Sequence, residues 1–179
     1  MTPVRTFERV CVLGSNSFTG AHMVNYLLAA SDCQILGVSR SPQVGSLFAP
    51  YHSHPQWASR FRFEQLDLNQ DFPRLVELLD AFRPQAVINY SAQGEVRNSW
   101  TWPHQWYETN VQGVVRLVEY LVQSQYTSCY LAASTPEVYG STGCEPVREN
   151  HNYQPSTPYG VSKLGGDLHL LARFRKDGF

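Results

Sequence analysis

The sequence predicts an α/β fold in which a parallel β-sheet is covered by helices on both faces. Short apolar runs typical of buried strands alternate with stretches whose apolar residues recur at helical spacing. Such alternation favours a doubly wound parallel sheet, because the crossover helices bury both faces of the strands. A length of 179 residues suits one domain with a sizeable core. We therefore expect a single domain over residues 1–179.

Apolar runs mark the expected strands. The first run is compact and ends at a glycine, and the third alternates between apolar and polar residues for only part of its length. Polar or glycine residues follow the ends of most of these runs, at the sheet edge where α/β proteins bind ligands. The expected strands cover residues 10–13, 35–38, 61–66, 86–90 and 128–133.

Helical spacing of apolar residues predicts the connecting helices. One covers about 21–28, and a second covers 72–82 and must end before Pro84. A long helix is expected from about 103 to 123. The last helix begins near Thr157, whose hydroxyl suits an N-cap before a proline in the first turn, and it runs to about residue 175. Residues 41–59 and 141–156 show no period and are expected to be irregular.

Composition excludes several classes of protein. The net charge of −1 gives no electrostatic case for binding nucleic acid or an anionic membrane. No apolar run reaches the roughly 20 residues that span a bilayer, and the first ten residues do not resemble a signal peptide. The cysteines lack metal-binding spacing and are expected to be reduced, which favours a cytoplasmic protein. They are Cys11, Cys33, Cys129 and Cys144. His52 and His54 lack a third ligand at suitable spacing, so no metal site is predicted.

A glycine-containing turn separates the first strand from the first helix. Glycines in this place let the backbone approach a pyrophosphate, which the helix N-terminus then attracts. Ser17 stands where a middle glycine is usual, so the motif is imperfect. A turn without any ligand is the alternative. The cofactor-binding residues predicted here are Gly14, Asn16, Ser17, Phe18, Thr19 and Gly20.

The end of the second strand predicts which cofactor is bound. NAD sites use an acidic residue about 20 positions after the fingerprint, but Asp32 precedes the strand and lies at the wrong edge. Ser39 and Arg40 follow instead, and an arginine beside hydroxyls suits a 2′-phosphate. The sequence therefore predicts NADP, with NAD as the alternative. A solvated Arg40 without a ligand is the other interpretation.

Tyr159 and Lys163 are four residues apart and share a face of the last predicted helix. An ammonium beside a phenol favours the phenolate, so the pair can provide a general base. With ten tyrosines in the chain, a chance occurrence of this spacing is the alternative.

The motifs together resemble the extended short-chain dehydrogenase/reductases, in the nucleotide-sugar epimerase/dehydratase group. The glycine turn, Asp67-Leu68, the segment 89–93, the segment 109–113, the segment 134–140 and the segment 159–163 match in order. The resemblance implies a Rossmann-like sheet and further cofactor contacts at Asp67, Leu68, Tyr90, Ser91, Ala92, Asn110, Tyr159 and Lys163. It implies substrate contacts at Gln93, Glu95 and Arg97. It also implies a homodimer formed by the helices near 103–123 and 157–175.

The resemblance implies an oxidative mechanism on a nucleotide-diphosphate sugar. Tyr159 is the acid/base, Lys163 lowers its pKa and holds the cofactor ribose, and Thr135 bonds the reacting oxygen. Glu137 matches the base with which 4,6-dehydratases remove a proton beside the new ketone. Pro136 replaces an aspartate found in many of them, and this departure is similar to GDP-mannose 4,6-dehydratases, which use NADP.

Other activities remain open at the level of sequence. An epimerase or a nucleotide-sugar decarboxylase of the same family is possible, and so is a catalytically silent dinucleotide-binding module. Relatives continue into a sixth strand and a smaller substrate domain. Phe179 falls just before both in these relatives, so we expect the chain to correspond to the dinucleotide-binding part alone, as a fragment, as half of a split enzyme or as a short protein.

Overall fold

A computed structural model describes residues 6–143 and 145–178. The chain divides into two compact units. The first comprises Met1–Ser91 and Leu121–Ala132 and is called the sheet unit here. The second comprises Ala92–Tyr120 and Ala133–Phe179 and is called the helical unit.

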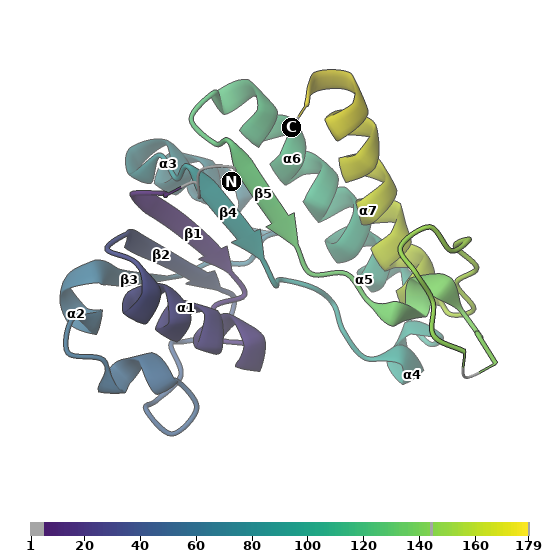
Figure 1. The fold of residues 1–179 in the computed structure, drawn as a ribbon, viewed down its shortest axis with the longest axis horizontal. Helices are drawn as coiled ribbons and strands as arrows, with labels where there is room; N and C mark the ends of the chain where they lie inside the picture. Colours follow the sequence, from purple (N-terminus) through teal and green to yellow (C-terminus); the bar gives the residue numbers. More distant parts are fainter. Residues whose placement is uncertain (1–5, 144, 179) are drawn as a thin grey trace. The chain divides into compact units, whose positions relative to one another are not determined.

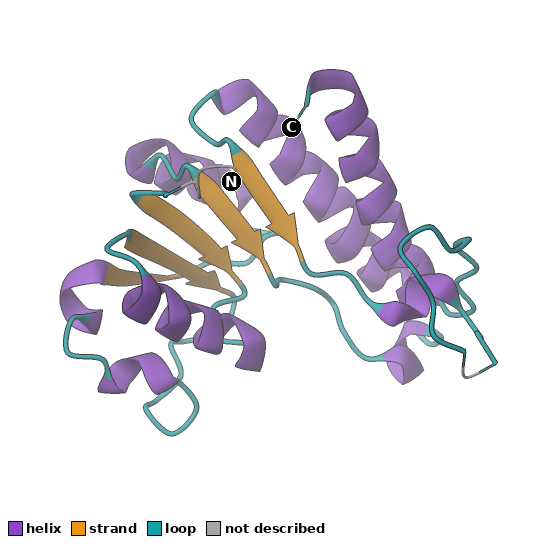
Figure 2. Ribbon diagram, in the orientation of Figure 1, coloured by secondary structure: helices purple, strands orange, loops and turns teal. Residues whose placement is uncertain are grey.

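The sheet unit contains a parallel five-stranded sheet in the order β3-β2-β1-β4-β5 (Figure 2). The predicted strands and the doubly wound α/β class are confirmed, and no strand end differs from its prediction by more than one residue. The first strand β1 lies in the middle and pairs with both β2 and β4. The strands are β1 Arg9–Leu13, β2 Gln34–Ser39, β3 Phe61–Gln65, β4 Ala86–Asn89 and β5 Cys129–Ala132.

Helices α1 (Phe18–Ala30) and α3 (Phe72–Phe82) connect the strands of this sheet. Helix α1 leads from β1 outward to β2, whereas α3 leads from β3 back across β1 to β4. Right-handed crossovers in opposite directions place the two helices on opposite faces of the sheet (Figure 1). The strand order therefore reverses between β1 and β4, and the carboxyl ends of these strands form a topological switch point.

The core beneath α1 explains the segment that the sequence predicted to be irregular. Val10 and Val12 of β1 pack with Val24 and Leu28 of α1 in one buried cluster. The same cluster contains Tyr51, which is fully buried. Tyr51 belongs to the 3-10 helix η1 (Pro50–Ser53), and the short helix α2 (Trp57–Arg60) follows. The prediction of an irregular 41–59 is therefore wrong over these two helices, because a buried aromatic residue anchors them.

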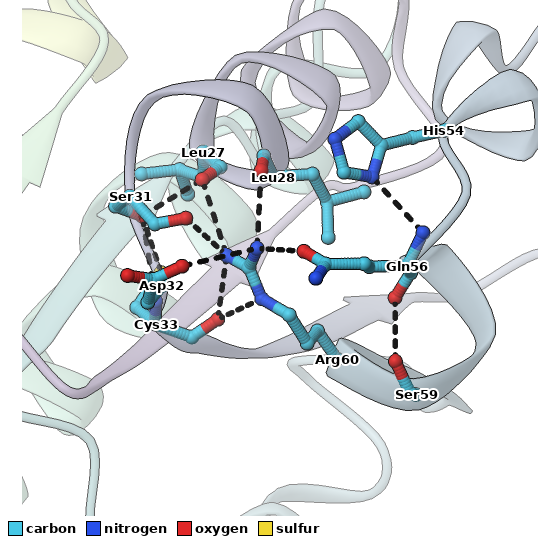
Figure 3. A network of polar contacts seen from close by, with 9 residues as sticks. All are labelled: Leu27, Leu28, Ser31, Asp32, Cys33, His54, Gln56, Ser59 and Arg60. Atoms are coloured by element: carbon cyan, nitrogen blue, oxygen red, sulfur yellow. Dashed lines mark hydrogen bonds and ion pairs between the residues drawn. The ribbon is translucent and has the colours of Figure 1, made fainter.

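Arg60, at the end of α2, holds the C-terminal end of α1 (Figure 3). Its guanidinium is almost fully buried and donates to the backbone carbonyls of Leu28, Ser31 and Cys33. Gln56 accepts another bond from it at 2.9 Å. The last carbonyls of a helix have no partner within the helix, and a cation there also complements the helix dipole. Arg60 therefore fixes the end of α1 that lies opposite the glycine turn.

The helical unit is built around α7 (Pro158–Asp177), which packs against the other helices of this unit. The predicted helix over 103–123 is divided into α5 (Pro103–Tyr107), a π-helical turn η2 (Glu108–Gly113) and α6 (Val114–Ser124). The ends of that prediction are confirmed, whereas its regular α-helical course is wrong. The short helices α4 (Val96–Ser99) and η3 (Pro136–Tyr139) complete the unit.

Thr157 caps α7 as predicted, since its hydroxyl accepts a bond from the Gly160 backbone N–H at 2.9 Å. Cys11, Cys33 and Cys129 are free thiols, and Cys144 lies outside the described residues. Within residues 6–143 and 145–178, no cluster of three or more His, Cys, Asp or Glu could hold a metal ion. None of the helices formed by these residues is long and apolar enough to cross a membrane.

Candidate active site

The glycine turn of the sheet unit is shaped by close backbone contacts. Gly14 has a φ of 75°, and a Cβ at this position would lie 2.7 Å from the Tyr90 carbonyl carbon. A Cβ on Gly20 would lie 2.2 Å from the Gly14 carbonyl oxygen. Neither position therefore accepts a side chain without a backbone shift. The turn leads directly into α1, whose N-cap Ser17 accepts a bond from the Gly20 N–H at 3.0 Å.

This turn fits a phosphate group. Because Gly14 and Gly20 have no side chains, a ligand can approach the backbone before α1, where N–H groups and the helix dipole attract an anion. Ser15 is fully buried, and its hydroxyl has no hydrogen-bond partner among the described residues. Phe18 and Thr19 are exposed at the start of α1. A dinucleotide pyrophosphate is the group that these features suit.

Asn16 connects the turn to the segment after β2. Its side-chain amide donates to the carbonyls of Ser41 and Pro42 at 3.0 and 2.7 Å, and its carbonyl accepts from the Val44 N–H at 3.4 Å. The Asn16 backbone N–H donates to the Ser39 hydroxyl at 3.0 Å. The structure therefore brings Asn16 and Ser39 together as predicted, but the Asn16 side chain binds protein atoms.

Arg40 and Asp67 line one open pocket of about 620 Å³ at the end of β2. Arg40 is exposed, and its backbone carbonyl accepts a bond from Gln65 at 3.0 Å. The Asp67 carboxylate accepts from the N–H groups of Asn69 and Gln70. Asp67 therefore shapes the turn that Leu68 also belongs to. Arg74 and three carboxylates, those of Glu64, Asp67 and Asp71, also line this pocket, so its charge is mixed.

The end of β4 meets the glycine turn within the sheet unit. The Asn89 side-chain oxygen Oδ1 accepts a bond from the Ser91 N–H at 2.8 Å, and a Cβ on Gly14 would lie 2.8 Å from the same nitrogen. Burial raises the pKa of Tyr90. Ser91 is therefore positioned beside the turn, as a shared ligand site requires. Ala92, predicted to contact the cofactor as well, begins the helical unit.

Lys163 lies on α7, one helical turn after the half-buried Tyr159. Lys163 is 9% exposed, and its ammonium donates to the Ala133 carbonyl at 2.7 Å. Burial lowers the pKa of Lys163, while the negative charge of Asp167 raises it. A largely buried ammonium on the same helix face as a phenol suits a general base, because the positive charge favours the phenolate.

Thr135 and Glu137 come from η3, which packs against α7. The Thr135 hydroxyl caps η3 by accepting the Glu137 N–H at 3.3 Å, so its own proton can be donated elsewhere. The Glu137 carboxylate accepts a bond from the Thr157 hydroxyl at 3.4 Å. The same threonine caps α7, which connects Glu137 to the first turn of the helix that carries Tyr159.

Asn110 occupies the π-helical turn and is buried. Its side chain bonds both backbone groups of Gln93, at 2.8 and 2.9 Å, and donates to the Ser162 hydroxyl at 3.0 Å. Ser162 in turn donates to the Tyr159 carbonyl at 2.7 Å. Asn110 was predicted to bind the cofactor. In the structure its side chain bonds protein groups and connects Gln93 to the helix that carries Tyr159.

Glu95 and Arg97, predicted as substrate contacts, lie at the start of α4. Glu95 has a φ of 72°, and its carboxylate accepts the N–H groups of Arg97 and Asn98, both at 3.1 Å. Glu95 therefore acts as a helix cap, whereas Arg97 is exposed. A capping carboxylate can still meet a ligand with its free lone pairs.

Three positions near the predicted site were not identified from the sequence. Thr157 was predicted only as a cap, and Ser162 and Asp167 were not predicted at all. Asp167 accepts a short hydrogen bond from the Ser134 hydroxyl. Helical spacing could have identified Asp167, because it follows Lys163 by four residues and so shares a face of the predicted helix with it.

A sequence profile of the GDP-mannose 4,6-dehydratases matches residues 11–177 of this chain. This chain belongs to that family. The family assignment confirms the resemblance found in the motifs, and the parallel sheet agrees with it.

Several known proteins are similar to this family member over nearly its whole length. A probable dTDP-glucose 4,6-dehydratase of Sinorhizobium fredii is 30% identical over 95% of the chain and 50% of that relative. A UDP-glucose 4-epimerase of Mycolicibacterium smegmatis is 28% identical over 90% of the chain and 50% of that relative. The solved dTDP-glucose 4,6-dehydratase DesIV of Streptomyces venezuelae, with NAD bound, is 29% identical and covers 96% of the chain and 53% of its own. Its TM-score is 0.81. The GDP-mannose 4,6-dehydratase family member described here thus spans about half the length of these proteins.

Proposed function

We propose that this chain is the cofactor-binding and catalytic part of a nucleotide-sugar 4,6-dehydratase. The observation that carries the proposal is the arrangement in the helical unit. There the buried Lys163 ammonium lies one turn from Tyr159, and Glu137 is bonded to the threonine that caps the same helix. Family membership and the dehydratases among the similar proteins support the reaction type.

Each group has one chemical task in the first half of the reaction. Tyr159 removes the proton from the sugar 4-hydroxyl while the nicotinamide cofactor accepts the hydride from the same carbon. Thr135 donates a hydrogen bond to the reacting oxygen. Lys163 provides the positive charge that favours the Tyr159 phenolate. The product of this half is a 4-ketone and a reduced cofactor.

Glu137 acts in the second half. Its carboxylate removes the proton from the carbon beside the ketone and delivers it to the hydroxyl on carbon 6, which leaves as water. The reduced cofactor would then return its hydride to carbon 6, and a proton equivalent to the one that Tyr159 removed is returned through Glu137 to the neighbouring carbon. The overall change is loss of one water, which gives a 4-keto-6-deoxy sugar and regenerates the oxidised cofactor.

The cofactor proposal rests on the sheet unit. The glycine turn, Ser39 and Ser91 line the carboxyl edge of the sheet, where a dinucleotide binds in folds of this type. Arg40 favours NADP, with NAD as the alternative because carboxylates share its pocket. If Arg40 binds a 2′-phosphate, Arg40→Asp weakens NADP binding relative to NAD in calorimetric titrations of this chain. Equal effects on both cofactors would contradict the NADP assignment.

The dehydratase proposal is tested with Glu137→Gln in the complete gene product. Incubation with a panel of nucleotide-diphosphate sugars is expected to give a 4-keto-6-deoxy product with the unchanged protein. Glu137→Gln is expected to lower product formation by about 10² or more, while the absorbance of reduced cofactor still rises. Glu149→Gln, an exposed glutamate in the 141–156 segment, is the matched control. Full turnover by Glu137→Gln would exclude the base role.

An epimerase is the second candidate, because a UDP-glucose 4-epimerase is among the similar proteins. An epimerase needs no base beyond Tyr159, so Glu137→Gln would then convert its substrate at an unchanged rate without a deoxy product. A decarboxylase of the same family would release carbon dioxide. A silent dinucleotide-binding module would bind the cofactor and convert none of the sugars.

We also propose a homodimer formed through α7 and the continuous helical stretch of α5, η2 and α6. Val161, Leu168 and Phe174 are exposed apolar residues on α7, at 42%, 46% and 61%. Val161 and Leu168 are seven residues apart and therefore lie on one face of α7, as an interface requires, whereas Phe174 adds exposed apolar surface on another face near the end of the helix. Leu168→Lys is expected to shift the mass measured by light scattering from dimer to monomer. A monomer before substitution would contradict the proposal.

A further inference from the structure

Asp167 lies on the same face of α7 as Lys163, four residues further along the helix. Its carboxylate accepts a short hydrogen bond from the Ser134 hydroxyl. Ser134 directly precedes Thr135 in the segment that also carries Glu137. Asp167 therefore joins the helix of Tyr159 and Lys163 to the start of the segment that holds the other two proposed catalytic groups.

Lys163 makes the neighbouring contact with the same segment. Its ammonium donates to the Ala133 carbonyl at 2.7 Å. Two consecutive residues, Ala133 and Ser134, are thus held by two side chains that are one helical turn apart on α7. A displacement of about 1 Å at a catalytic group can cost about 10² in rate, so this pair of contacts is well placed to control the position of Thr135.

The second contribution of Asp167 is its charge. Lys163 is only 9% exposed, and a buried ammonium needs compensation by an opposite charge or by hydrogen bonds. One carbonyl satisfies one of its three donors. Burial lowers the pKa of Lys163, and Asp167 acts in the opposite direction. The carboxylate therefore favours the charged form of the lysine.

We propose that Asp167 is a positioning residue of the catalytic site, which holds Ser134 and supplies the counter-charge of the Lys163 ammonium. The inference rests on the dehydratase function proposed above and adds a residue that acts through its neighbours. Asp167 touches neither the substrate nor the reacting atoms in this role. Its two tasks can be separated by substitution.

Asp167→Asn keeps the shape of the side chain and an acceptor for Ser134 but removes the charge. Ser134→Ala keeps the charge and removes the bond. In the complete gene product, Asp167→Asn is expected to lower kcat about tenfold at pH 8 with little change in KM for the sugar, because Thr135 is less well positioned and the Lys163 ammonium loses a nearby opposite charge. Ser134→Ala is expected to lower kcat by a smaller factor.

The pH profile distinguishes a charge effect from a structural one. Loss of a nearby negative charge lowers the pKa of an ammonium, so the alkaline fall in activity should move to lower pH in Asp167→Asn and stay in place in Ser134→Ala. Other ionisable groups lie on α7 or on elements packed against it, and all variants share them. They are Arg97, His104, Tyr107, Glu108, Arg116, Glu119, Tyr120, Glu137, Tyr139, Tyr159, His169, Arg173, Arg175, Lys176 and Asp177.

Asp177→Asn is the matched control, because Asp177 is on the same helix and pairs with Arg173 at 3.0 Å. It is expected to leave kcat and the pH profile unchanged. Asp167→Glu keeps the charge, so its activity is expected to fall at the same alkaline pH as that of the unchanged protein. This variant also tests the charge if Asp167→Asn does not fold.

Two results would overturn the inference. In one, Asp167→Asn matches the unchanged protein in kcat and pH profile while Tyr159→Phe is inactive, so that the proposed function stands without Asp167. In the other, Asp167→Glu shows the same alkaline shift as Asp167→Asn, so that the charge plays no part. Full activity of Tyr159→Phe would instead exclude the proposed function, and the inference with it.

Discussion

The sheet unit and the helical unit prepare their proposed sites in different ways. In the sheet unit, the glycine turn is shaped by backbone contacts such as the close approach of Gly20 to Gly14, and the Asn16 side chain binds protein atoms. In the helical unit, the side chains of Thr135, Glu137 and Lys163 are themselves the proposed chemical groups. Substitutions in the first unit should therefore act on cofactor affinity through the backbone, and those in the second should act on the chemical step.

The largest expected effect tests the helical unit. Tyr159→Phe removes the only proton-accepting atom of that side chain, so kcat for nucleotide-sugar conversion should fall by about 10² to 10⁴ in the complete gene product. Cofactor affinity should change much less, as measured by calorimetry. Tyr153→Phe, at an exposed tyrosine in the 141–156 segment, is the control. A Tyr159→Phe protein that loses cofactor binding to the same degree as turnover would remove the contrast between the units.

The second prediction tests the backbone of the sheet unit. Gly20→Ala places a Cβ 2.2 Å from the Gly14 carbonyl oxygen, so the turn must move. NADP affinity of this chain should fall about tenfold or more, which is about 1.4 kcal/mol, in a titration monitored by cofactor fluorescence. Gly45→Ala meets no atom within 4 Å and should bind as before. Unchanged binding by a folded Gly20→Ala protein would show that the turn does not contact the cofactor.

The smallest expected effect refines the same comparison. Asn16→Ala removes the bonds to Ser41 and Pro42, each of which contributes about 0.5–1.5 kcal/mol. The backbone bond from Asn16 to Ser39 is retained. NADP affinity should fall only a few-fold, with kcat unchanged. The exposed Asn152→Ala is the control. A fall in kcat would mean that the sheet unit influences the chemical step more directly than proposed.

The regular elements could be predicted because burial determines their pattern. The strands are short apolar runs, and the N-cap at Thr157 follows from a hydroxyl before a proline. The 3-10 helix at 50–53 could not be predicted, since one buried tyrosine leaves no period. The π-helical turn was also missed. Apolar residues continue on both sides of it, so the pattern alone resembles one continuous helix.

The proposed site was predictable in its residue types and less so in their contacts. Tyr159 and Lys163 are identified by spacing, and the structure places them one helical turn apart. The bonds of Asn16 and Glu95 depend on which backbone groups the fold brings near them, and short polar side chains often satisfy such groups locally. The sequence alone does not distinguish a side-chain oxygen that binds a ligand from one that caps a helix, so both residues were predicted to contact a ligand.

The π-helical turn at Glu108–Gly113 also constrains the length of this stretch of chain. A π-helical bond closes over five residues where an α-helical bond closes over four, so loss of one residue here would leave an ordinary and stable helix. Each residue of an α-helix turns the chain by about 100°. The shortened helix would therefore carry Asn110 away from Gln93 or from Ser162. Deletion of a single residue should be tolerated by the fold and not by the site, a distinction that conservative side-chain replacements cannot reveal.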